Sequence, residues 1–352
     1  MKKGIRDYNI KIGSMAHGKR NSVSDVPGVT VGHTTLSDGD IQTGVTAVLP
    51  HQDNIFREKL IAASHVINGF GKTTGLVQID ELGTLESPIL LTNTLSVGTV
   101  QSALVDYMLN DTPEIGRSTG TVNTVVGECN DMVLNDIRRE SIQKEDVWNA
   151  IRTASADFEE GAVGAGRGMV CYSLKGGIGS SSRLIPLPHG TYTLGVLVLS
   201  NFGFISDLMI NGRQFGMEIK DKIIPPEDTS DKGSIIIIAA TDLPVSQLQL
   251  KRIIKRSAAG LSRTGSIIGN GSGDIVIGFS TASRIPHQKT QSPFDIPQIH
   301  DDEIDHAFRA AGEAVEEAVL NSLINSESVT GRNGVTKKSL KEFLNNNYKN
   351  NT

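Results

Sequence analysis

The chain has 352 residues, a formal net charge of −5 and a hydrophobic content of 38%. These values are typical of a globular protein and argue against nucleic acid or an anionic membrane as its main partner. The two cysteines, Cys129 and Cys171, make no disulfide framework and lie in no CxxC motif, so a reducing cytoplasm is the expected location.

The N-terminal part of the chain predicts strands and one helix. The first residues of the sequence are charged, but no apolar run follows them, so we expect no secretory signal there. No stretch of the chain is long and apolar enough to predict a membrane span. Apolar residues that recur at helical spacing predict a helix over residues 97–107. Short apolar segments bounded by turn residues predict strands at residues 26–33, 43–50 and 88–93.

Residues 68–75 form a glycine-rich segment that invites comparison with a phosphate-binding loop. Gly71-Lys72-Thr73 matches the end of a Walker A motif. The motif also requires glycine at the position that Val66 occupies, so we reject this interpretation.

Polar residues follow an apolar lead-in at residues 125–131. Glu128, Asn130 and Asp131 stand at the end of this predicted strand, where polar groups often line a site. A solvated turn is the alternative, and the segment by itself does not exclude it. A helix is expected next, around Trp148, which is interpreted as a packing residue.

The second half of the chain predicts strands that are apolar on both faces, mixed with helices. The strands are expected at residues 191–203, in the isoleucine run of residues 231–241, and after a glycine-rich turn within residues 269–280. The helices are expected at residues 248–261 and 304–318, the second of them amphipathic. Strands without polar alternation are buried on both sides. We therefore expect one domain, residues 1–352, built as a four-layer α/β/β/α sandwich of two packed sheets covered by helices.

The junction between Gly233 and Ser234 is the strongest candidate for chemistry. Four consecutive isoleucines follow Ser234, and the polar, proline-bearing residues 225–232 precede it. The serine thus stands where an exposed loop enters a rigid strand. A glycine before it lets the backbone adopt strained conformations that a side chain would forbid. The hydroxyl could then attack the Gly233 carbonyl and free the α-amino group of Ser234. An ordinary turn before a strand is the alternative.

The absence of other catalytic motifs limits the chemistry that the chain could perform. No serine lies in a GxSxG nucleophile elbow, and the eight histidines form no HExxH motif, so we expect neither an α/β-hydrolase site nor a metal site, and no cofactor. A serine nucleophile then needs another base. A free α-amino group has a pKa near ~7.7–8.0, which suits a general base at neutral pH.

Taken together, these segments resemble the DmpA family of serine aminopeptidases, peptidase family S58. This family includes L-aminopeptidase/D-esterases and β-peptidyl aminopeptidases. The resemblance covers nearly the full length. It is carried by eight short segments in this order, at residues 25–33 (DVPGVTVGH), 43–50 (TGVTAVLP), 86–93 (ESPILLTN), 127–131 (GECND), 195–203 (GVLVLSNFG), 233–242 (GSIIIIAATD), 263–265 (RTG) and 272–281 (SGDIVIGFST).

The resemblance implies a precursor that cleaves itself. Residues 1–233 would become an α-chain and residues 234–352 a β-chain. The fold would be the α/β/β/α sandwich of N-terminal-nucleophile-like hydrolases, shared with the ornithine acetyltransferases. The substrates would be small peptides, amides or esters, and the processed pairs would assemble into a homo-oligomer, a tetramer by analogy.

Site residues follow by matching positions. Ser234 would be the nucleophile, and Asn201 would donate to the oxyanion. Ser272 and Asp274 would lie beside the new N-terminus, where the carboxylate orients or stabilises the amine; β-aminopeptidases of the family carry Glu at the position of Asp274. Glu128 would hold the substrate's ammonium group, because an aminopeptidase needs an anion there.

Two positions depart from the family pattern. Met132 and Val133 stand where the family often has Gly-Tyr, so a site tyrosine is not carried over, and Ala16-His17-Gly18 replaces Pro-Thr-Gly. An acyltransferase of the ornithine acetyltransferase type is an alternative, although those enzymes use threonine as the nucleophile. A relative that keeps the fold without activity is a second alternative.

Overall fold

The isoleucine strand lies in the centre of the molecule and faces two different cores. The computed structural model describes residues 4–223 and 233–347. In β11 (Ser234–Thr241), Ile235 and Ile237 pack into one hydrophobic core, while Ile236 and Ile238 pack into another. Successive side chains of a strand point to opposite faces, so one run of isoleucines serves both cores. The expectation of a strand buried on both sides is confirmed.

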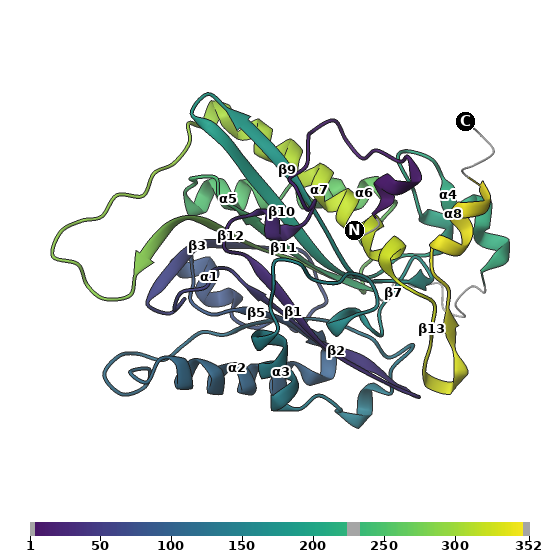
Figure 1. Cartoon of the computed structure of the whole chain (residues 1–352), viewed down its shortest axis with the longest axis horizontal. Coiled ribbons are helices and arrows are strands. Elements are labelled where there is room, and N and C mark those ends of the chain that lie inside the picture. The colour runs from purple at the N-terminus through teal and green to yellow at the C-terminus, as the bar shows by residue number, and fades with distance from the viewer. Residues whose placement is uncertain (1–3, 224–232, 348–352) are drawn as a thin grey trace.

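Two β-sheets pack face to face around β11 (Figure 1). The larger sheet is antiparallel except for the parallel β11–β12 pair. Its strands run in the order β4 (Thr84–Leu85), β3 (Glu58–Gly69), β12 (Gly273–Pro286), β11, β10 (Gly190–Asn201) and β9 (Gly177–Leu187). The smaller sheet has the order β1 (Thr30–Asp38), β2 (Ile41–Leu49), β5 (Ile89–Asn93) and β6 (Val125–Cys129), of which β5 and β6 are parallel.

Helices cover both outer faces and complete four layers. On the larger sheet lie α5 (Gln247–Ile254), α6 (Ser257–Arg263) and α7 (Ile304–Asn325), and on the smaller sheet lie α2 (Val97–Asp111) and α3 (Lys144–Arg152) (Figure 1). The peripheral elements are α1 (Leu76–Leu82), α4 (Phe215–Ile219), α8 (Lys341–Asn347), β7 (Val170–Cys171), β8 (Leu174–Lys175), β13 (Val329–Thr330) and β14 (Thr336–Lys337). The α/β/β/α sandwich expected from the sequence is the observed architecture.

Short 3-10 helices join these elements. They are η1 (Ile5–Tyr8), η2 (Val23–Asp25), η3 (Thr94–Ser96), η4 (Ile137–Arg139), η5 (Gly164–Gly166), η6 (Ile205–Asp207), η7 (Lys220–Lys222), η8 (Asp301–Glu303) and η9 (Arg332–Gly334). Among the described residues, no helix has both the length and the apolar character needed to cross a bilayer.

Some local expectations differ from the structure. The single helix expected over residues 248–261 is divided into α5 and α6 by a break at Lys255 and Arg256. The sequence analysis did not foresee β3 or β9, because their serine, glycine and charged residues hide the strand pattern.

Helix α7 is not simply amphipathic, because its polar side is also buried. Arg183 of β9 is fully buried and pairs with Glu313 at 3.1 Å and with Glu317 at 2.7 Å. Arg6 of the N-terminal segment pairs with the same Glu317 at 2.6 Å. The buried carboxylates are thus matched by guanidinium groups, as buried charges require.

Candidate active site

Three strand ends place the predicted catalytic residues at one edge of the larger sheet. Ser234 is the first residue of β11, and its Cα pairs with Asn201 at the end of β10. On its other side Ser234 pairs with Gly273, the first residue of β12. Ser272 and Asp274 flank Gly273, so residues from three distant parts of the chain meet here.

The Ser234 hydroxyl is buried and lacks a hydrogen-bond partner. The residue is 5% exposed, and its Oγ has no hydrogen-bond partner of ordinary geometry within the described part of the chain, although the Cys129 thiol lies close to it. Buried hydroxyls are nearly always paired, and an unpaired one costs about 1–3 kcal/mol. Other buried hydroxyls among the described residues, such as those of Ser64 and Ser257, are also unpaired, so the position of this serine at the start of β11, opposite Asn201, is what marks it as a candidate.

Gly233 is required by close packing rather than by a left-handed backbone. A Cβ at this position would lie 2.5 Å from the Cα of Phe202 and 2.7 Å from the carbonyl oxygen of Asn201. Its φ lies outside the left-handed region, so a side chain is excluded here by the neighbouring backbone. The Gly233 carbonyl oxygen accepts a hydrogen bond of 3.3 Å from the Gly273 N–H, which polarises the bond that joins Gly233 to Ser234.

Ser272 and Asp274 form a buried pair. The Ser272 hydroxyl donates to Asp274 Oδ1 at 2.7 Å, and both residues are almost fully buried. Asn68 Nδ2 and the Phe70 N–H both donate to the Ser272 carbonyl oxygen, so the loop after β3 fixes the serine backbone. The glycine-rich segment that we rejected as a phosphate loop is therefore a wall of this site.

Asn201 is held by two backbone groups. Its Oδ1 accepts from the Val170 N–H at 2.9 Å, and its Nδ2 donates to the Asn130 carbonyl oxygen at 3.0 Å. An amide nitrogen carries two hydrogens. One of them is used on Asn130, and the second is suited to an oxygen that develops charge beside Ser234.

Glu128 reaches the site from the smaller sheet. Its Oε1 accepts from the Lys72 N–H at 3.0 Å, and its Oε2 accepts from the Thr94 hydroxyl. A Cβ on Gly71 would lie 3.8 Å from Glu128 Oε1 and 3.7 Å from the Gly273 Cα. A single glycine therefore separates this carboxylate from the strand end that pairs with Ser234.

Cys129 lies beside Ser234 but is not a nucleophile. Burial, aided by the nearby Glu128 carboxylate, raises the pKa of the Cys129 thiol well above its ordinary value. The reactive form of cysteine is the thiolate, so a protonated, buried thiol is inert. Ser234 is the hydroxyl available at this position.

Asp131 is a buried carboxyl next to the Asn130 carbonyl that anchors Asn201. Burial raises the pKa of Asp131 to about 7, although a hydrogen bond from Asn135 Nδ2 at 3.0 Å opposes this. A carboxyl whose pKa is raised by folding stabilises the fold most below the unfolded pKa of 3.8, and this contribution is lost as the pH rises to about 7.

The Asp131→Asn variant is expected to abolish this pH dependence. Each unit of pKa difference corresponds to about 1.4 kcal/mol, so between about pH 4 and pH 7 the wild type should lose a few kcal/mol of unfolding free energy that the variant keeps. Urea denaturation of both proteins across this range measures the difference. Parallel curves for the two proteins would show that Asp131 does not titrate in this way.

The predicted site residues lie together in the structure, but the prediction left out several residues that support them. The structure brings Asn201, Ser234, Ser272 and Asp274 together, with Glu128 at their side. Sequence reasoning missed the supporting residues Asn68, Lys72 and Thr94. The signal for the first two was the glycine run at residues 68–75, and the signal for Thr94 was its position directly after a buried strand.

The departures from the family pattern lie on the surface. Met132 is 49% exposed and Val133 is 40% exposed, directly after the Asn130–Asp131 pair. Their apolar side chains thus border the site without entering its buried centre.

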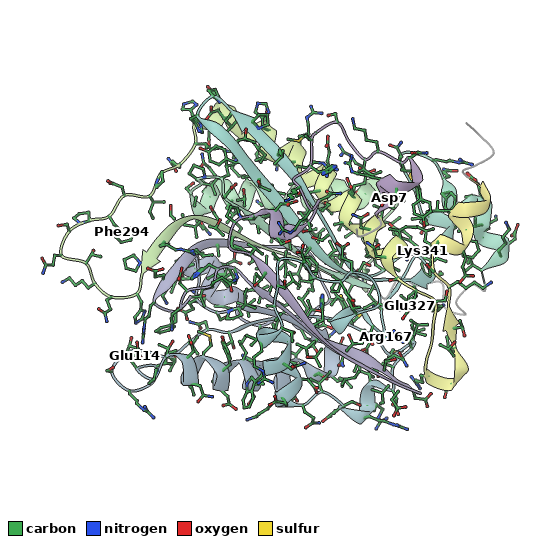
Figure 2. The ribbon with its side chains drawn as sticks, in the orientation of Figure 1. Asp7, Glu114, Arg167, Phe294, Glu327 and Lys341 are labelled. Atoms are coloured by element: carbon green, nitrogen blue, oxygen red, sulfur yellow. The ribbon has the colours of Figure 1, made fainter. Side chains whose placement is uncertain are left out.

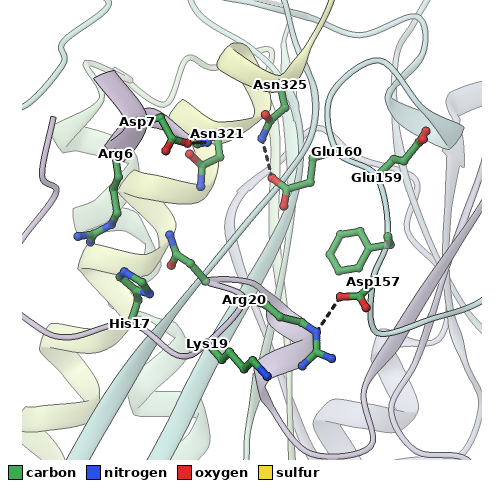
Figure 3. A pocket seen from close by; sticks show the side chains of 13 residues that line it. Arg6, Asp7, His17, Lys19, Arg20, Asp157, Glu159, Glu160, Asn321 and Asn325 are labelled. Carbon is green, nitrogen blue, oxygen red and sulfur yellow. Dashed lines mark hydrogen bonds and ion pairs between the residues drawn. The ribbon is translucent and has the colours of Figure 1, made fainter. Parts of the chain in front are cut away.

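A separate cavity of about 620 Å³ lies away from these residues, between the N-terminal segment and α7 (Figure 3). Two polar contacts join residues of its lining: Arg20 Nε donates to Asp157 at 2.9 Å, and Asn325 Nδ2 donates to Glu160 at 3.1 Å. The cavity contains none of the predicted catalytic residues. Over residues 4–223 and 233–347 there is also no cluster of three or more His, Cys, Asp or Glu that could hold a metal ion.

Comparison with known proteins assigns the class and then the family. The fold is that of an L-aminopeptidase D-Ala-esterase/amidase from Ochrobactrum anthropi, described as a prototype for the serine aminopeptidases and a variant of the Ntn hydrolase fold. That structure has a TM-score of 0.91 and 32% identity over 98% of this chain and 97% of that one. The model of peptidase family S58 matches residues 21–337, and the chain belongs to this family.

Two further relatives agree with this assignment. The PH0078 protein of Pyrococcus horikoshii OT3 is 47% identical, with a TM-score of 0.93 over 97% of this chain and 98% of that one. β-Peptidyl aminopeptidase BapA of Sphingosinicella microcystinivorans is 36% identical over 341 residues, which cover 91% of this chain and 85% of the relative. The resemblance to DmpA-type aminopeptidases stated from the sequence is confirmed.

Proposed function

We propose that the chain is a self-processing serine aminopeptidase that removes N-terminal residues from small peptides, amides or esters through an acyl-enzyme on Ser234. The observation that carries this proposal is the orphaned, buried Ser234 hydroxyl. It lies next to a polarised Gly233 carbonyl and opposite the Asn201 amide. Membership in a peptidase family supports the hydrolytic chemistry.

Maturation would begin with the Ser234 hydroxyl. Its Oγ attacks the Gly233 carbonyl carbon, the C–N bond breaks, and the acyl group moves from nitrogen to oxygen as an ester. Water then hydrolyses the ester, which leaves a carboxylate on Gly233 and a free α-amine on Ser234. Residues 1–233 and 234–352 become the two chains of the processed enzyme. The Gly273 N–H, which already bonds to the Gly233 oxygen, would stabilise the oxyanion of the first step.

Turnover would use the same oxygen atom with the new amine as its base. The amine takes the hydroxyl proton as Ser234 attacks the substrate carbonyl, and it returns the proton to the leaving amine. Asn201 Nδ2 would donate to the tetrahedral oxyanion. Asp274, oriented by Ser272, would lie close enough to stabilise the protonated amine. Water then releases the acyl group from Ser234.

Glu128 would give the enzyme its preference for substrates with a free amino group. Its buried carboxylate accepts hydrogen bonds from the Lys72 N–H and the Thr94 hydroxyl, which are both neutral donors. A substrate ammonium group would therefore supply the charged partner that the carboxylate lacks. We expect the wild type to hydrolyse aminoacyl p-nitroanilides and to leave their N-acetylated forms intact. Glu128→Gln should raise KM for the free amines by about 10-fold or more, since a charge-assisted hydrogen bond contributes ~1.5–3 kcal/mol.

Steady-state kinetics on matched free and N-acetylated substrates test this expectation. Equal hydrolysis of both forms by the wild type would remove Glu128 from substrate recognition. Release of nitroaniline only when an acyl acceptor is added would instead identify an acyltransferase. Absence of any turnover by a correctly processed enzyme, across a panel of side chains, would contradict the aminopeptidase proposal.

A further inference from the structure

The direction of the Asn201 amide is fixed by one backbone donor. The Val170 N–H can only donate, so the group that faces it at 2.9 Å must be the amide oxygen. The nitrogen is then directed to the Asn130 carbonyl at 3.0 Å and to the site. An amide turned the other way would set N–H against N–H and carbonyl against carbonyl. The positions of Val170 and Asn130 therefore together decide whether Asn201 presents a donor, and Val170 fixes the oxygen side.

Val170 belongs to a segment that has little regular structure of its own. It begins β7, which forms a two-residue hairpin with β8. The hairpin turn holds Tyr172 and Ser173 at positive φ values of 51° and 61°. Before it lies η5, and Arg167 joins this region to the C-terminal part of the chain through a 2.9 Å ion pair with Glu327 (Figure 2).

A buried lysine holds this segment in place. Lys175 is completely buried, and its Nζ donates to the carbonyl oxygens of Gly166 at 2.8 Å, Met169 at 2.9 Å and Gly176 at 2.7 Å. An ammonium group has three N–H donors, so each one is used. Two of the three acceptors lie in the segment that leads directly to Val170.

The arrangement is expensive for a group that only fills space. Within the described ranges Lys175 forms no ion pair, and burial, with a contribution from Arg167, lowers its pKa well below its ordinary value. Burying a charge on neutral acceptors costs several kcal/mol, whereas an apolar side chain of the same length would fill the space without that cost. The benefit of the ammonium is geometric: the Met169 carbonyl also accepts from the Gly176 N–H and the Gly176 carbonyl from the Ser326 hydroxyl, and the ammonium joins these groups at one point.

We propose that Lys175 is a positioning residue for Asn201. By holding the carbonyls of Gly166 and Met169, its ammonium group places the next N–H, at Val170, where it orients the Asn201 amide with Nδ2 toward the carbonyl attacked by Ser234. The inference rests on the proposed role of Asn201, and it adds a residue that does not touch the substrate.

The test is a double-mutant cycle between Lys175→Met and Asn201→Ala. Methionine keeps most of the length and apolar volume of lysine but has no N–H donors. Lys175→Met alone should lower kcat by about 10- to 100-fold with KM changed less than about threefold, because only transition-state stabilisation is lost. In the Asn201→Ala background the same change should lower kcat by less than about threefold, since the donor it positions is absent.

The assays use purified, processed enzyme, and intact mass gives the processed fraction of each variant. Lys59→Met is the matched control, because Lys59 is also largely buried and pairs with Glu86. It lies at the opposite end of β3 from Gly69, roughly 30 Å along the strand. This control should lower the melting temperature and leave kcat unchanged, which separates a loss of stability from a loss of positioning.

Two results would overturn the inference: wild-type kcat in processed Lys175→Met, or a loss that multiplies fully with that of Asn201→Ala. If Lys175→Met does not fold, Lys175→Gln replaces it in the double-mutant cycle, because glutamine keeps two N–H donors. The inference then requires that Lys175→Gln lowers kcat less in the Asn201→Ala background than in the wild type. Wild-type kcat in Asn201→Ala alone would instead refute the proposed oxyanion role, so the two failures are distinguishable.

Discussion

Ser234→Ala is expected to remain a single chain of 352 residues and to show no peptidase activity. The variant lacks the oxygen that attacks Gly233, so neither the ester nor the free amine can form. It also lacks the oxygen that would carry the acyl group in turnover. One atom thus accounts for both losses, and the fold should persist because the hydroxyl makes no hydrogen bond within the described residues. Intact mass and hydrolysis of aminoacyl p-nitroanilides are the two measurements.

Two controls make this result specific. Sequencing of the shorter wild-type chain must give Ser234 as its first residue, because a contaminating protease could cut at a bond before Ser234. Ser234→Cys should still cleave to some extent, since a thiol is a competent nucleophile. If Ser234→Ala is cut at the same bond and still turns over substrate, the central claim about Ser234 is wrong. If the wild type stays uncut yet hydrolyses substrate, the base is a group other than the α-amine.

Asn201→Ala is expected to lower kcat by ~10²–10³-fold in the processed enzyme, with KM little changed, because removal of one preorganised oxyanion donor has effects of this size. The substitution also leaves the Val170 N–H and the Asn130 carbonyl without their partner, so a modest loss of stability should accompany it. Circular dichroism and thermal melting separate this loss from the kinetic effect. Unchanged kcat would remove Asn201 from the proposed mechanism.

Asn201→Asp provides a sharper comparison. Aspartate has nearly the same shape and still accepts from the Val170 N–H, but its ionised carboxylate has no hydrogen to give to an oxyanion. We therefore expect a loss at least as large as that of the alanine variant. A smaller loss would indicate that shape, rather than donation, is what Asn201 contributes.

Several features were predictable because their signals are local. The run of four isoleucines predicts a strand buried on both faces, which the structure contains, whereas the exposed loop predicted at residues 225–232 lies outside the described residues. The short segments that resemble the DmpA family also lie within continuous stretches, so they identify the family without any knowledge of contacts. The four-layer arrangement followed from strands without polar alternation.

Other features depend on contacts between distant parts of the chain. Asn201, Ser234 and Gly273 become neighbours through the register of β10, β11 and β12, and a pattern of apolar residues does not specify the partner of a strand. β3 was missed, and the glycine-rich segment at its end was recognised without its role, although Asn68 and Phe70 anchor Ser272 and Lys72 contacts Glu128. Likewise, Glu128 belongs to the other sheet, so only the packing of the two sheets brings it to the site.

The amino-acid sequence alone therefore determined the central strand, the layered architecture and the family, and it singled out Ser234 as the proposed nucleophile, because these signals reside in contiguous residues. The tertiary structure decided how the nucleophile is surrounded. Lys175 is the clearest case: a lysine in a sequence indicates a solvated surface position, but here three carbonyl groups from the folded chain enclose its ammonium group. Such an enclosure exists only after folding, because the backbone groups that satisfy the charge come together only when the surrounding strands pair.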